Sequence, residues 1–139
     1  RNCLSKIKII EMSKKHVYMT DLHFEHKAWI SELSFQRDEL EFFKHRLEEV
    51  VPRYTDKTTL AKAERFQNQM IRYNEILDIL FHEINEHESQ LTKVAHDNPI
   101  ASDHVHFDDH TGLRDKVETQ RKIYAEFKEE YFRYLTKTM

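Results

Sequence analysis

The chain has 139 residues, with 25 acidic and 22 basic side chains and a net charge of −3 at pH 7. Acids and bases are interspersed, whereas nucleic-acid affinity depends on clustered Lys and Arg. We interpret the one basic cluster, near the N-terminus, as a solvated tail and expect no nucleic-acid partner. No apolar run approaches the roughly 20 residues that span a bilayer, so we also expect no membrane segment. The single cysteine, Cys3, cannot form an internal disulfide. The apolar patch near the N-terminus is short and interrupted by lysines, so we expect no signal peptide and a cytoplasmic protein.

Residues 1–19 form the first segment, which we separate from a helical bundle spanning residues 20–139. Its apolar side chains, Leu4, Ile7 and Ile10, are interrupted by lysines. The segment is therefore either a short docking helix or a tail, and the sequence leaves both open. Met12 has the context of a natural start, which would make residues 1–11 an upstream extension.

Few helix-breaking residues divide the rest of the chain, which contains one glycine and two prolines. The residue before a proline is disfavoured in a helix, so Pro52 and Pro99 mark the divisions. Between them, apolar residues recur alternately three and four positions apart over many turns, which is the coiled-coil-like pattern of a helix with one buried seam. The seam positions are Leu22, His26, Trp29, Leu33, Gln36, Leu40, Phe43, Leu47 and Val50; Ala63, Phe66, Met70, Tyr73, Leu77, Leu80, Ile84, His87, Leu91 and Val94; and His110, Leu113, Val117, Gln120, Tyr124, Phe127, Tyr131 and Tyr134. The pattern predicts an all-α protein.

The predicted helices cover about residues 20–51, 58–96 and 108–137. Thr20 is the candidate N-cap of the first helix, because its hydroxyl can accept a free backbone N–H of the first turn. Asp108 or Asp109 would cap the third helix in the same way. The polar run that precedes them is then a loop.

Short connections make consecutive helices antiparallel neighbours, so we predict an up-down-up bundle. The simplest register places His26 opposite Ile84 and His87 opposite Val117. A shift by one heptad would pair the seam residues equally well. The longer connection between the second and third helices leaves room for such a shift between those two helices.

The helices carry more apolar surface than one seam can bury. A large exposed apolar patch is rare on a soluble monomer. Either the N-terminal segment covers this surface as a fourth helix, or the chain forms a homodimer, which we slightly favour. The apolar residues outside the seams are Ile30, Phe35, Phe42, Ile71, Ile76, Ile79, Phe81, Ile123, Phe132 and Leu135.

The predicted topology collects all the histidines except His45 at or near one end of the bundle. His26, His87 and His110 occupy seam positions where leucine is expected. Imidazole and carboxylate groups on facing helices can bind zinc or iron, so one hypothesis is a metal held by His26 and His87, with Glu83 or His110 completing the site. The other, which we rank first, is that the seam histidines are hydrogen-bonded to Gln120, a tyrosine or a backbone carbonyl.

No catalytic pattern accompanies these histidines. The only glycine is Gly112, so there is no glycine-rich phosphate loop, and no serine or cysteine has the setting of a nucleophile. We therefore expect a non-enzymatic interaction or assembly module without a cofactor, which associates with itself or with another helical protein. The alternative function is a metal-binding bundle that holds zinc or iron.

Overall fold

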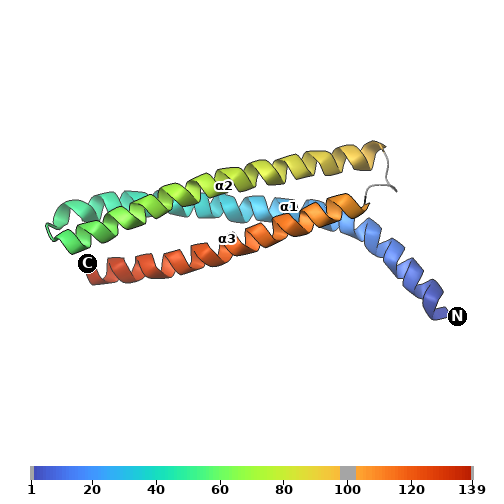
Figure 1. Ribbon diagram of the computed structural model, residues 1–139, viewed down its shortest axis with the longest axis horizontal. Helices are drawn as coiled ribbons and strands as arrows, with labels where there is room; N and C mark the ends of the chain where they lie inside the picture. Colours follow the sequence, from blue (N-terminus) through green and yellow to red (C-terminus); the bar gives the residue numbers. More distant parts are fainter. Residues whose placement is uncertain (1, 98–102, 139) are drawn as a thin grey trace.

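The computed structural model describes residues 2–97 and 103–138, and the side chains of residues 21–93 and 109–138. Within these ranges the chain consists of three long helices packed against one another, without a strand, so the all-α prediction is confirmed. The helices are α1 (Asn2–Val50), α2 (Lys57–Asp97) and α3 (Asp103–Thr138), and a 3-10 turn (Val51–Arg53) follows α1. In Figure 1, α2 runs back beside α1, and α3 runs back beside α2. None of the described helices combines the length and the apolar character that crossing a membrane requires.

Two predicted helix starts differ from the observed ones. Thr20 lies inside α1, which is helical from Asn2 and therefore includes most of the 1–19 segment. The first turns of α1 lead away from the other two helices (Figure 1). Asp108 and Asp109 lie inside α3, which begins at Asp103, so neither is an N-cap. Neither stretch contains a glycine or proline that would stop a helix, so a residue type typical of N-caps does not by itself mark a helix start.

The connection between α1 and α2 has a clear local cause. Pro52 cannot donate the backbone hydrogen bond of a regular helix, and the chain passes through the 3-10 turn to an extended Tyr54. Asp56 then caps α2: its carboxylate accepts the backbone N–H of Thr59 at 3.3 Å and the Thr59 hydroxyl at 3.0 Å. The Thr59 hydrogen bonds also lower the pKa of Asp56.

The seam prediction describes the core closely. Every buried side chain in the described ranges comes from a predicted seam position. Of the remaining seam residues, Tyr73 is half-buried, and the side chain of Val94 lies outside the described residues. Two polar seam residues meet in the core, where Gln120 donates to the Gln36 amide oxygen at 3.5 Å.

Ion pairs at the seam edges show how α1 and α3 are aligned. Three glutamates of α1 spaced seven residues apart bind three cations of α3 with the same spacing. The pairs are Glu25–Arg114, Glu32–Arg121 and Glu39–Lys128. This repeat is that of two parallel helices in constant register. We call the three pairs the ion-pair ladder.

Buried polar groups add hydrogen bonds between the helices. Tyr131 donates to the Phe43 carbonyl at 2.7 Å, and Tyr134 donates to the Thr59 carbonyl at 3.0 Å. Backbone carbonyls recur every heptad, so these two bonds do not select a register. The Gln36–Gln120 pair does, because a one-heptad shift would separate the two buried amides at a cost of about 1–3 kcal/mol each.

The observed register differs from the simplest predicted one. The His26 ring contacts the His87 ring, with centroids 5.0 Å apart, as a joint metal site of these two residues requires. The difference lies between α2 and α3. The His87 ring contacts His110 at 5.6 Å, which corresponds to a shift of one heptad from the predicted partner Val117. This shift is the alternative that the longer connection allows, and it brings His110 to the level of the other two histidines.

Candidate metal centre

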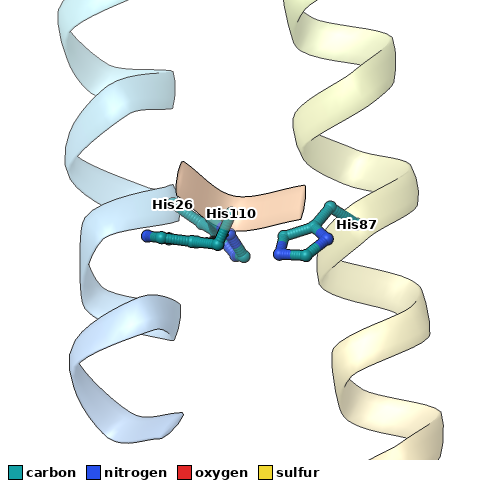
Figure 2. A group of neighbouring side chains, drawn as sticks. All are labelled: His26, His87 and His110. Carbon is teal, nitrogen blue, oxygen red and sulfur yellow. Dashed lines mark hydrogen bonds between the residues drawn. The ribbon is translucent and has the colours of Figure 1, made fainter. Parts of the chain in front are cut away.

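Three buried imidazoles, one from each helix, meet in a single layer of the core. His26 of α1, His87 of α2 and His110 of α3 have exposed fractions of only 1%, 5% and 0%. One potential ligand atom from each residue lies within 4.8 Å of the other two. Figure 2 shows the three rings at the same level, pointing toward one another from separate helices. We call this set the histidine layer.

In His26 and His110, the ring nitrogen that faces away from the other imidazole contacts a carboxylate. Nδ1 of His26 is paired with Glu88 of α2, which also contacts the exposed His23. Nε2 of His110 is paired with Glu25 at 3.3 Å. The inward nitrogens, Nε2 of His26 and Nδ1 of His110, are 3.0 Å apart.

Trp29 closes one side of the layer. Its ring stacks on His110 with centroids 4.8 Å apart and an interplanar angle of 27°, and it lies 5.5 Å from His26. Trp29 is itself buried. The imidazoles therefore have an aromatic wall that excludes water and restricts ring rotation.

Burial disfavours the charged form of one imidazole of the layer. It lowers the pKa of His110 to about 4, although the Glu25 hydrogen bond acts in the opposite direction. Burial tends to raise the pKa of Glu25 and Glu88, but their hydrogen bonds outweigh it and lower both values: Glu25 is bonded to Arg114 and His110, and Glu88 to His26 and His23. Both carboxylates are therefore ionised at neutral pH, next to a neutral His110.

Three of the four predicted metal ligands belong to the histidine layer, and the fourth does not. The Glu83 carboxylate instead accepts a hydrogen bond from Lys116 of α3 at 3.0 Å. Glu83, Lys116 and His87 line a groove of ≈ 340 Å³ between α2 and α3, so Glu83 lies beside the layer and not within it. Gln120, the predicted hydrogen-bond partner of the seam histidines, is bonded to Gln36.

Sequence reasoning missed the two carboxylates that hold the imidazoles. Glu25 precedes His26 and Glu88 follows His87 in the sequence. Each therefore lies at the edge of a seam, where side chains reach the neighbouring helix. The edge position is the signal in the sequence that indicates these two residues, whereas Glu83 lies one turn from His87 on the same helix.

The remaining histidines are divided between the surface and the undescribed side chains. His82 is exposed and pairs with Glu86, and His45 at the opposite end pairs with Glu41 and Glu48. The side chains of residues 103–108, which include most of the sequence DHVHFDDH, lie outside the described residues. Of the two residues of that stretch whose side chains are described, Asp109 and His110, the layer includes His110.

Comparison with known proteins gives no family assignment. No protein-family model matches the chain, and no curated protein or solved structure matches it. Function is therefore inferred from the geometry of the site.

The low pKa of His110 makes the stability of the metal-free protein depend on pH. In the unfolded chain the imidazole titrates near 6.5, and in the folded protein at about 4. Stability is thus fully present above pH 6.5 and falls as the pH decreases toward 4, by at most about 3 kcal/mol for this residue. Urea unfolding in the presence of EDTA between pH 7.5 and 4 measures the decrease. In His110→Leu the part of the decrease that is due to His110 should disappear; an equal decrease in both proteins would contradict the prediction.

Proposed function

We propose that this bundle binds one divalent transition-metal ion through His26, His87 and His110, and that zinc is the preferred ion. The observation that carries the proposal is the convergence of three buried imidazoles from three helices, with potential ligand atoms within 4.8 Å of one another. Inward-facing side chains on separate helices are how helical bundles build metal sites.

A bound ion would add to the stability that hydrogen bonding gives the layer. A buried leucine at a seam position contributes about 1.5–3 kcal/mol through the hydrophobic effect, and three such positions are occupied by histidine. The contacts of His26 with Glu88 and of His110 with Glu25 offset part of this loss, at about 1.5–3 kcal/mol for each hydrogen bond to a charged group. Structural zinc contributes on the order of 10 kcal/mol to folding in small domains, so a bound ion can offset the polar layer.

The donor atoms narrow the choice of metal. Magnesium and calcium require oxygen ligands, whereas imidazole nitrogen suits zinc, copper, nickel and iron. Non-haem iron sites commonly combine two histidines with a carboxylate ligand. Here Glu25 and Glu88 contact outward imidazole nitrogens, which leaves a three-nitrogen set. Zinc accepts three histidines, with water or another ligand in its fourth position.

A metal titration of the purified chain tests this proposal. We expect one zinc ion per chain in isothermal titration calorimetry and a zinc-dependent increase in the melting temperature. We expect zinc binding to weaken by at least about 100-fold in each of His26→Ala, His87→Ala and His110→Ala, since each substitution removes one of the three proposed ligands. His45→Ala is the matched control, because His45 is exposed at the opposite end of α1. Failure of the wild type to bind zinc, or an equal loss in His45→Ala, would contradict the proposal.

Self-association is a second candidate function, favoured by the exposed apolar surface. Phe35 and Phe42 are 62% and 69% exposed, and each follows an α1 glutamate of the ion-pair ladder by three residues. They therefore lie on the flank of α1 that faces α3, and the exposed Phe132 of α3 lies against Phe43, at a ring distance of 5.5 Å. We propose a second copy of the chain as the occupant of this face, because a symmetric contact would cover the same aromatic residues on both copies.

Sedimentation velocity measures this association. The wild type should form a dimer whose dissociation constant increases at least about tenfold in Phe42→Glu, since a buried interface charge costs more than one kcal/mol. Ile71→Glu, which changes an exposed residue of α2 outside this face, should dimerise as the wild type does. A wild type that stays monomeric at high concentration would exclude the candidate.

A further inference from the structure

We propose that Glu25 and Glu88 are positioning residues of the metal site, which hold His110 and His26 so that each ring presents a defined nitrogen to the ion. His110 would bind through Nδ1 and His26 through Nε2. This inference rests on the proposed metal-binding function and adds two residues, with their roles, to the site.

The orientation follows from the contacts of the outward nitrogens. An ionised carboxylate only accepts hydrogen bonds, so the imidazole nitrogen facing it must carry a proton. Glu88 therefore places a proton on Nδ1 of His26, and Glu25 places one on Nε2 of His110. In metal sites, ligating histidines commonly donate their second N–H to a carboxylate in this way, which fixes both tautomer and ring orientation.

The inward nitrogens then need a cation between them. If each ring carries only its outward proton, the lone pairs of Nε2 of His26 and Nδ1 of His110 point at each other across 3.0 Å. A shared proton relieves this repulsion but creates an imidazolium in the core. A metal ion bonded to both nitrogens at about 2.0 Å relieves it as well and needs only a slightly wider separation.

The two carboxylates also match the charge of the ion. Three neutral imidazoles leave a divalent ion with two uncompensated positive charges in a buried layer, where charge is costly. Glu25 and Glu88 supply two negative charges, each one imidazole ring away. Arg114, the ladder partner of Glu25, offsets part of the Glu25 charge, whereas the second carboxylate, Glu88, contacts two histidines.

The ion-pair ladder supplies an internal control for the role of Glu25. Glu25 and Glu32 occupy equivalent positions one heptad apart on α1. Each makes a two-bond pair with an arginine of α3: Glu25 binds Arg114 at 2.5 and 3.1 Å, and Glu32 binds Arg121 at 2.5 and 2.7 Å. Their exposed fractions are also equal, at 31%. Glu25 differs from Glu32 in one described contact: its carboxylate is also paired with His110 of the histidine layer.

Zinc affinity measured by competition with a chromophoric chelator tests the positioning role. We expect Glu25→Ala and Glu88→Ala to weaken zinc binding about 10- to 100-fold, as loss of a carboxylate behind a ligating histidine usually does. Glu25→Gln should lose less, because its amide oxygen still accepts from Nε2 of His110. Glu32→Ala should match the wild type within about twofold. Equal losses in Glu25→Ala and Glu32→Ala would show that only the ion pair matters and would overturn the proposal.

Nitrogen-15 NMR of the imidazoles separates this inference from metal binding itself. In the metal-free protein we expect a slowly exchanging proton on Nδ1 of His26 and on Nε2 of His110, and in the zinc-loaded protein the same protons should persist. If the protein binds no zinc but shows these protons, the metal proposal fails and the carboxylate contacts stand. If it binds zinc with His110 coordinated through Nε2, the positioning proposal is overturned and the metal site stands.

Discussion

The register of the three helices is the constraint on which the histidine layer depends. A seam of apolar residues tolerates sliding by a heptad, because leucines and valines pack in either position. Polar groups remove that freedom, since a buried hydroxyl or amide that loses its partner is costly. Gln36 and Gln120 meet only in the observed register, and a shift by one heptad would separate their amides. The same register brings His26, His87 and His110 to one level.

The heptad pattern made much of the fold predictable. Alternate spacings of three and four identified three helices and every buried side chain of the described ranges, including the three histidines. The helix starts were less predictable, because residues 2–20 and 103–109 contain polar side chains but no helix breaker. In those segments Thr20, Asp108 and Asp109 are residue types typical of N-caps, yet α1 and α3 continue through them.

The candidate site was only partly predictable, for a related reason. Seam position marked His26, His87 and His110 as inward-facing, but the pattern repeats every seven residues and cannot select among registers. The predicted register placed Val117 opposite His87, a heptad from His110. Glu83 was chosen because it lies one turn from His87 on α2, yet Lys116 of α3 holds its carboxylate. Spacing along one helix shows which residues share a face of that helix. Which residues they meet on the next helix depends on the register between the two.

X-ray absorption spectroscopy at the zinc edge of the loaded protein tests the central claim most directly, because it reports the ligand atoms themselves. A site built from the histidine layer predicts nitrogen or oxygen neighbours at about 2.0 Å, with outer-shell scattering from three imidazoles. A sulfur neighbour near about 2.3 Å would place the ion at Cys3, the only cysteine. That result, or a shell of oxygen atoms without imidazole scattering, would contradict the account.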